Sequence, residues 1–328
     1  MNAPGPTILP VLPGITAIDT RLAGEDALNA VYLLSGSEPC LVEAGPETDG
    51  PRLRHALELL GVGSADLAHI VVTHIHMDHA GGVGELLQRF PRARVWVHER
   101  GAPHLADPAR LLASTARTYG PEQLARLYGG MRPCDPERIR AVTDGALIPL
   151  GDRHLRVLYT PGHASHHVAL YDSVTGALWT GEAIGSYLPW ADSYRPAMPP
   201  PEADPEVAIS SIERMRSLRP SALLTSHFGP TPDVDEGFER GVASIRRWSD
   251  AVAQYLREDP SADDDAIDAA LHRLAAQEFR SDAGRPLAPE LARYDALGSI
   301  RMNAQGLARY WRKRWERDGA ETGAAPLS

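Results

Sequence analysis

The sequence predicts an α/β fold, and three observations carry that prediction. Residues 28–43 have the pattern of two short apolar strands around a turn. Residues 51–60 place apolar side chains at helical spacing. Residues 70–72 form another short apolar run, after which a helix over 82–89 and a strand over 95–97 are expected. Such alternation of strands and helices is typical of α/β architectures.

The later part of the chain continues this alternation. Residues 103–128 look mostly helical and are expected to form a small cap. Strand character returns in three segments, at 155–159, 168–171 and 177–179. Residues 187–205 are rich in proline and aromatic side chains, which indicates a long ordered loop or a lid. A helix over 205–218 and a strand over 222–225 are expected to follow.

The pattern changes to helices alone from about residue 236. One helix is expected over 236–257, and a second is expected to begin near Ser261. Ser261 can cap this helix through its hydroxyl, and acidic residues occupy the first turn. A chain of 328 residues favours two domains. We therefore predict an α/β domain over residues 1–240 and an all-helical C-terminal domain over 241–328.

Composition and charge exclude several classes of protein. The net charge of −10 gives no support for a nucleic-acid partner. No apolar stretch reaches the ~20 residues that a membrane span needs, and no signal peptide is visible. Cys40 and Cys134 lie far apart in the sequence, which argues against a disulfide framework and a thiolate zinc site. These features predict a cytoplasmic protein without a membrane partner.

A candidate metal site follows directly after the apolar run at 70–72. Four side chains that can bind metal fall within six residues there, namely His74, His76, Asp78 and His79. Imidazole and carboxylate groups suit zinc, iron and manganese. A helix would scatter the four groups around its axis, whereas a loop that leaves a buried strand can gather them. Gly81 and Gly82 then allow a sharp backbone turn.

The segment from Thr73 to Gly82 resembles the metal-binding signature of the metallo-β-lactamase superfamily. Three later segments resemble the rest of that family's pattern in the expected order, namely Thr160-Pro161-Gly162-His163, Trp179-Thr180-Gly181-Glu182 and Ser226-His227-Phe228-Gly229. The resemblance covers roughly residues 10–240. It implies a four-layer αβ/βα sandwich carrying the catalytic site, here with an all-helical C-terminal extension. The form of the motif is most similar to the branch with glyoxalase II-like thioesterases and lactonases.

The resemblance further implies a binuclear metal site. The first metal would be held by His74, His76 and His163. The second would be held by Asp78, His79 and His227. Residue 182 would bridge the two ions. Two zinc ions are the expected cofactors, with iron or manganese as alternatives.

Two positions depart from the family's usual residues. Glu182 stands where aspartate is usual, and its extra methylene moves the carboxylate outward by ~1.5 Å. Glu182 would still bridge both metals, bind one of them only, or change the preferred metal. Glu43 also replaces an aspartate, and we expect it to orient a ligand histidine, the alternative being a plain acid at a strand end.

Other side chains are expected near the site or the substrate. His98 ends the strand over 95–97 and is placed to approach the substrate. His167 and its neighbour His166 would hydrogen-bond near the site or face solvent. Three aromatic residues of the proline-rich loop would either close over an apolar or acyl substrate or pin the loop to the surface; these are Tyr187, Trp190 and Tyr194.

These expectations favour a hydrolase that uses a metal-bound hydroxide to cleave an ester, lactone or thioester of a small molecule. Asp78 would fix the hydroxide and carry a proton to the leaving group, while also serving as a ligand. The alternatives are an iron-dependent oxygen-using enzyme on the same fold and a ligand-binding protein that kept the site without turnover. The C-terminal helices are expected to line one wall of the cleft or to form a homodimer contact.

Overall fold

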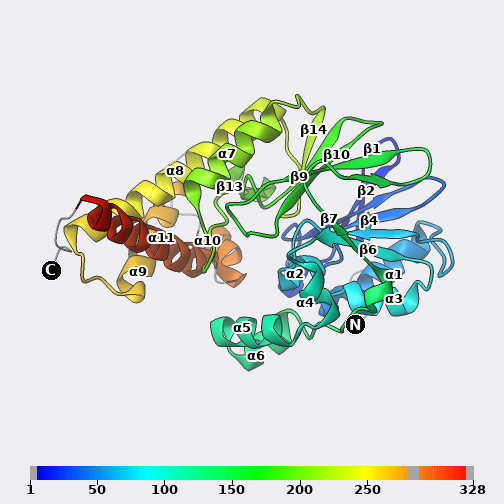
Figure 1. Cartoon of the computed structure of the whole chain (residues 1–328), viewed down its shortest axis with the longest axis horizontal. Coiled ribbons are helices and arrows are strands. Elements are labelled where there is room, and N and C mark those ends of the chain that lie inside the picture. The colour runs from blue at the N-terminus through cyan, green and yellow to red at the C-terminus, as the bar shows by residue number, and fades with distance from the viewer. Residues whose placement is uncertain (1–5, 280–287, 298, 323–328) are drawn as a thin grey trace.

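Two β-sheets face each other in the computed structural model, which describes residues 6–279, 288–297 and 299–322 (Figure 1). The first sheet holds seven strands in sequence order: β1 (Thr7–Leu12), β2 (Ile15–Asp19), β3 (Ala30–Leu34), β4 (Cys40–Val42), β5 (His69–Val71), β6 (Arg94–His98) and β7 (Ile139–Val142). The second holds six, in the order β15 (Gly229–Pro230), β14 (Ala222–Thr225), β11 (Ala177–Gly181), β10 (Val168–Asp172), β9 (His154–Tyr159) and β8 (Leu147–Pro149).

Helices cover the outer faces of both sheets and form the C-terminal part (Figure 1). They are α1 (Gly50–Leu59), α2 (Met77–Ala80), α3 (Val83–Arg89), α4 (Ala102–Ala106), α5 (Ala109–Tyr119), α6 (Pro121–Leu127), α7 (Pro205–Arg216), α8 (Val234–Glu258), α9 (Asp264–Glu278), α10 (Ala288–Tyr294) and α11 (Ser299–Thr322). Short 3-10 helices lie at Leu22–Gly24, Glu47–Asp49, Pro136–Arg138, Pro189–Ala191 and Asp295–Leu297. None of the helices described is long and apolar enough to cross a membrane.

The central strands bury both of their faces, and successive side chains of each strand point to opposite sides of the sheet. In β4, Val42 packs between the two sheets, whereas Leu41 packs outward with α1 and α3. In β11, Trp179 points between the sheets and Leu178 points toward α7 and α8. Tyr32 meets Trp179 edge to face across the central layer, with ring centroids 6.0 Å apart. The predicted four-layer αβ/βα sandwich is confirmed.

The C-terminal helices share a core with the second sheet. Apolar side chains of α8, α9 and α11, such as Trp248, Leu271 and Leu307, belong to the same buried cluster as Leu223 of β14. The all-helical extension is confirmed. The predicted boundary at residue 240 falls inside α8, and the division into two domains stays a prediction.

Two local predictions differ from the structure. Asp263 caps α9 by accepting a hydrogen bond from the backbone of Ala266, whereas Ser261 lies outside the cap. The proline-rich loop also contains a hairpin of two strands, β12 (Ser186–Leu188) and β13 (Ser193–Arg195). A carboxylate accepts hydrogen bonds from the free N–H groups of a first helical turn as well as a hydroxyl does, so Asp263 can take the role predicted for Ser261.

The sheets bring the candidate site residues to one edge. β4 and β5 are parallel, as are β11 and β14, so each pair delivers its carboxyl ends to the same side. The segment with His74 follows β5, Glu182 follows β11 and His227 follows β14. His163 lies in the connection between β9 and β10.

Gly306 of α11 provides a test of how closely the C-terminal helix is fitted to the rest of the fold. A Cβ at this position would overlap the backbone oxygen of Met198. Gly-to-Ala in a helix interior normally stabilises by ~1 kcal/mol, whereas forced overlap costs ~1–3 kcal/mol. We therefore expect Gly306→Ala to lower Tm in thermal unfolding. The neighbouring Gln305→Ala should leave Tm nearly unchanged, and a Tm raised by Gly306→Ala would contradict this packing.

Candidate metal centre

The first group of candidate ligands gathers around one point. Nε2 of His74 lies 3.0 Å from Nδ1 of His76 and 3.2 Å from Nε2 of His163. Nε2 of His163 lies 3.0 Å from Nδ1 of His76 and 3.0 Å from Oε2 of Glu182. A tetrahedron with such edges has a centre about 1.9 Å from each corner, close to the ~2.0 Å of a zinc–nitrogen bond.

A second group lies directly beside the first. Nε2 of His79 is 3.2 Å from Nε2 of His227 and 3.5 Å from Oδ2 of Asp78. Nε2 of His227 is 3.3 Å from the same carboxylate oxygen. Two imidazoles and a carboxylate leave room for further ligands, such as water or a substrate oxygen.

The carboxylate of Glu182 reaches both groups. Its Oε2 is 3.2 Å from Nε2 of His74 and 3.4 Å from Nε2 of His79, while Oε1 is 3.6 Å from Nε2 of His227. One carboxylate therefore faces both sets of nitrogens. The longer side chain still reaches the position between them.

The charges of the site call for cations between these groups. Burial lowers the pKa of His76 to about 3, and it also holds the pKa of His74 well below its ordinary value, so both rings are neutral at pH 7. The Nδ1–H groups of His74 and His163 bind elsewhere, so their Nε2 lone pairs face each other at 3.2 Å and repel unless a positive centre lies between them. Burial disfavours a charged His79, yet the carboxylates of Asp78 and Glu43 raise its pKa. The residues present thus fit a pair of divalent metal ions.

Glu43 holds the back of the site together. Its fully buried carboxylate accepts hydrogen bonds from the hydroxyls of Thr73 (2.6 Å) and Ser226 (2.8 Å), and it lies 3.2 Å from Nδ1 of His79. Thr73 Oγ1 in turn lies 3.0 Å from Nδ1 of His74. These contacts place the protons on Nδ1 and direct both Nε2 lone pairs toward the centre. Glu43 thus contacts His79 directly and His74 through Thr73, and its role in orienting them stays a prediction.

The backbone of Glu43 is itself unusual. Its φ of 71° lies in the left-handed region, which costs a non-glycine residue of the order of 1 kcal/mol or more. Such strain persists only where the surroundings fix the residue. The three hydrogen-bonding partners of the carboxylate supply that fixation.

His167 positions the backbone of Glu182. Its Nε2 accepts a hydrogen bond from the N–H of Glu182 (3.1 Å), which leaves Nδ1–H to donate to Thr160 Oγ1 (2.8 Å). His167 is therefore buried beside the site rather than facing solvent. His98 stacks on Tyr159 at a centroid distance of 4.7 Å and does not line the cavity.

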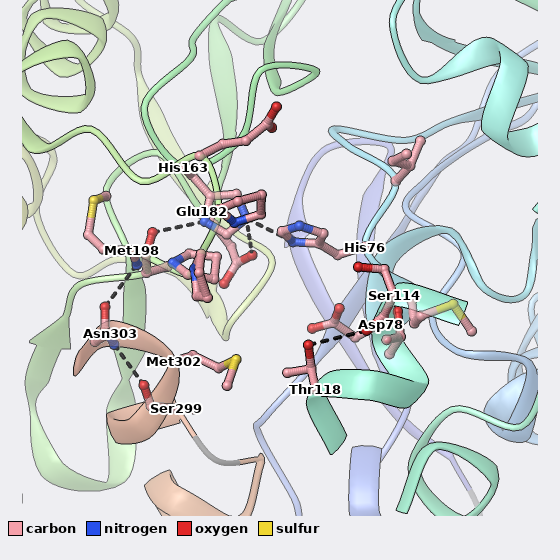
Figure 2. A pocket seen from close by; sticks show the side chains of 18 of the residues that line it. His76, Asp78, Ser114, Thr118, His163, Glu182, Met198, Ser299, Met302 and Asn303 are labelled. Carbon is pink, nitrogen blue, oxygen red and sulfur yellow. Dashed lines mark hydrogen bonds and ion pairs between the residues drawn. The ribbon is translucent and has the colours of Figure 1, made fainter. Parts of the chain in front are cut away.

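The candidate ligands open onto a cavity of about 680 Å³. Figure 2 shows Ser114 and Thr118 of α5 on one side of the cluster and Met198, Met302 and Asn303 on the other. The predicted cap at 103–128 and the predicted wall from the C-terminal helices therefore both exist.

The three loop aromatics lie elsewhere, which corrects the expectation that they contact the substrate. The rings of Tyr187 and Tyr194 contact each other at a tilt, with centroids 5.0 Å apart, and both are buried against α8. Trp190 stacks on Phe279 at 6.1 Å. Their rings fill the core between the hairpin and the C-terminal helices, so the second alternative, an anchoring role, describes them better. None of the three lines the cavity.

A family model for the metallo-beta-lactamase superfamily matches residues 23–227. The chain belongs to the metallo-beta-lactamase superfamily. The matched segment begins before Glu43 and ends at His227, so it contains every candidate metal ligand. α9, α10 and α11 lie beyond it.

Several relatives share this superfamily fold. The metallo-beta-lactamase fold-containing protein ST1585 of Sulfurisphaera tokodaii is 31% identical over 167 residues, covering 50% of this chain and 61% of that protein. A hydroxyacylglutathione hydrolase of Synechococcus sp. is 28% identical over 191 residues, covering 58% and 59%. Human acyl-coenzyme A thioesterase MBLAC2 is 34% identical over 129 residues, covering 37% and 43%. Each match spans less than two thirds of the relative.

A solved structure shows the same fold over nearly the whole chain. The metallo-beta-lactamase family protein TTHA1429 of Thermus thermophilus superposes with a TM-score of 0.62, covering 95% of this chain and 94% of that protein at 23% identity. The likeness in fold thus extends past the segment matched by the family model and includes the C-terminal helices.

One residue with no sequence signal connects these helices to the metallo-beta-lactamase site. The buried amide of Asn303 in α11 accepts from the N–H of Met198 (2.8 Å) and donates to the carbonyl of Pro196 (2.9 Å). Ala197, between them, accepts a hydrogen bond from Nδ1–H of His163 (2.8 Å). Asn303 therefore holds the backbone that orients His163.

This arrangement predicts the effect of Asn303→Ala. Losing the two amide contacts should let the segment around Ala197 move, and loss of such support typically weakens metal binding by ~10–100-fold. We expect the first of two metal-binding steps to weaken, measured by competition with a chromophoric chelator and by the absorption of Co²⁺-loaded protein.

A matched control is Ser249→Ala, which removes a hydroxyl that accepts from Trp311 Nε1 (3.1 Å) in the same group of helices. It should lower stability slightly without changing metal affinity. Equal metal affinities for the parent and Asn303→Ala would show that Asn303 serves the fold alone.

Proposed function

We propose that the chain is a metal-dependent hydrolase that cleaves an ester, lactone or thioester bond of a small molecule. The observation that carries this proposal is Glu182, which faces both groups of candidate ligands at the floor of an open cavity. Two divalent ions held there would supply hydroxide from water near neutral pH and polarise a substrate carbonyl. Zinc is the metal we assign to both positions.

The distances between the ligand atoms assign each candidate residue to one of the two ions. His74, His76 and His163 would hold one ion, and Asp78, His79 and His227 would hold the other, with Glu182 shared. Glu43 would orient the ring of His79, and His167 would hold the backbone N–H of Glu182.

Asp78 has a further proposed role in proton transfer. Burial alone would raise its pKa, but His79 and His227 outweigh that effect and hold the pKa below its ordinary value. Its carboxylate lines the cavity and stays ionised. As an ionised carboxylate it would hold the attacking water by accepting a hydrogen bond from it, and we assign to the same group the transfer of a proton to the leaving group.

Thioesters are the bond type that we place first. Two of the relatives bear names of thioester hydrolases, a hydroxyacylglutathione hydrolase and an acyl-coenzyme A thioesterase. The wall formed by Met198 and Met302 suits an apolar acyl group.

The function is tested by metal removal and reconstitution. Chelator-treated protein should lose hydrolysis of a panel of acyl thioesters, esters and lactones, and two equivalents of Zn²⁺ should restore it. Hydrolysis that survives complete metal removal would contradict the proposal.

Iron is the second candidate, because Glu182 replaces the usual aspartate and imidazole–carboxylate sites also bind iron. Aerobically purified protein with two iron atoms, visible absorption and oxygen consumption would favour an oxygen-using enzyme. Stoichiometric zinc with no turnover on any panel member would favour a ligand-binding protein.

Glu182→Gln tests the bridging role. The change keeps the shape of the side chain and removes the charge that offsets two adjacent dications, so the second ion should bind more weakly and turnover should fall with it. Glu182→Asp should be milder, because it keeps the charge. The measurement is metal content per chain together with the hydrolysis rate for all three proteins. Two ions held as tightly by Glu182→Gln as by the parent would rule Glu182 out as a ligand.

A further inference from the structure

One wall of the cavity carries three arginines. Helix α5 presents Arg110, Ser114 and Arg117 to the cavity, at spacings of four and three residues that place them on one helical face. Arg100, in the turn after β6, lines the same space. We call Arg100, Arg110 and Arg117 the arginine wall.

The charges of the arginine wall are not matched within the protein. Among the described residues, none of its three guanidinium groups forms an ion pair or a hydrogen bond; Arg100 contacts only the ring face of Tyr159 at 5.9 Å. Other exposed arginines, such as Arg94 and Arg156, also lack such partners among the described residues. The feature that distinguishes the arginine wall is that its three guanidinium groups line one cavity.

The opposite wall has another character. It is formed by Met198, the prolines at 199–201, Met302 and Asn303, and so it offers mainly apolar contact (Figure 2). The candidate metal ligands lie between the two walls. A substrate that spans the cavity would therefore meet cations at one end and apolar side chains at the other.

We propose that the arginine wall binds an anionic group, a phosphate or a carboxylate, on the part of the substrate remote from the bond that is cleaved. This inference rests on the proposed hydrolase function and names its substrate class: an acyl ester or thioester whose leaving group carries negative charge. The acyl group lies along the wall formed by Met198 and Met302, and the carbonyl lies over the candidate metal ligands.

Geometry and electrostatics both support this assignment. Arg110 and Arg117 are two helical turns apart, about 10 Å along α5, so they can reach separate oxygens of an extended anionic group. The planar guanidinium suits phosphate and carboxylate, which it binds through paired N–H donors. A net charge of −10 repels anions from the molecule as a whole, so a local positive wall is needed to concentrate an anionic substrate at the site.

The test measures binding separately from catalysis. Three non-hydrolysable thioether analogues with the same acyl chain are compared on the metal-loaded protein: one built on neutral N-acetylcysteamine, one on phosphopantetheine and one on glutathione. We expect at least one anionic analogue to bind about tenfold more tightly than the neutral one. This preference should shrink as salt is raised. Comparing the phosphopantetheine analogue with the glutathione analogue identifies whether the wall prefers phosphate or carboxylate.

Arg110→Gln/Arg117→Gln should abolish that preference and leave the affinity for the neutral analogue within about twofold. The control is Arg126→Gln on α6, an exposed arginine that bonds only to Gln123 and does not line the cavity. In kinetics with the corresponding thioesters, the double variant should have a raised KM for the anionic substrate and an unchanged kcat.

The outcomes separate this inference from the proposed function. Equal binding of neutral and anionic analogues, or a preference that survives in the double variant, overturns the arginine wall as an anion site. Hydrolysis of all thioesters without charge preference leaves the hydrolase intact and removes this inference. Anion binding that depends on Arg110 and Arg117 without any hydrolysis supports the anion site and contradicts the hydrolase.

Discussion

The position of Glu182 between two groups of imidazole nitrogens is the constraint on which the rest of the site depends. Its Oε2 lies 3.0 Å from His163 and 3.4 Å from His79, so a single carboxylate serves both groups. Imidazole lone pairs and carboxylate oxygens that face one another at these separations repel, so they require positive charge between them, from a metal ion or a proton. That requirement explains why the site is backed by hydrogen bonds that fix each ring, and why Glu43 keeps an otherwise unfavourable backbone conformation.

The fold meets this requirement from several directions. Parallel strands of the two sheets deliver His74 and His227 to one edge, and the buried Glu43 joins the loops that follow them. His163 depends on a different support, because its Nδ1–H binds a backbone segment held by Asn303 of α11. The C-terminal helices thus contribute to the site in two ways: they support the backbone that binds one candidate ligand, and they form the apolar wall of the cavity.

The sequence brings out the candidate ligands because the information that marks them is local. His74 to His79 lie within six residues after a recognisable strand, and the later motifs follow in order. The role of Asn303 has no such pattern, since it depends on a contact between residues 105 positions apart. The sequence gives no sign of the arginine wall either, because two arginines seven residues apart on a helix, such as Arg110 and Arg117, usually mark a solvated face. Trp190 was ambiguous, because an aromatic ring in a proline-rich loop can equally well pack in a core or line a cleft. The edge strand β1 was not predicted; it contains Pro10, and proline is unfavourable inside a strand.

Anomalous diffraction from crystals of the zinc-loaded protein tests the central claim most directly. Data collected on both sides of the zinc edge should reveal two peaks ~3.5–4 Å apart, the spacing usual for two-metal sites. One peak should lie among His74, His76 and His163, and the other among Asp78, His79 and His227, with the Glu182 carboxylate between them. A single peak, or two peaks with Glu182 turned away from both, would contradict the account.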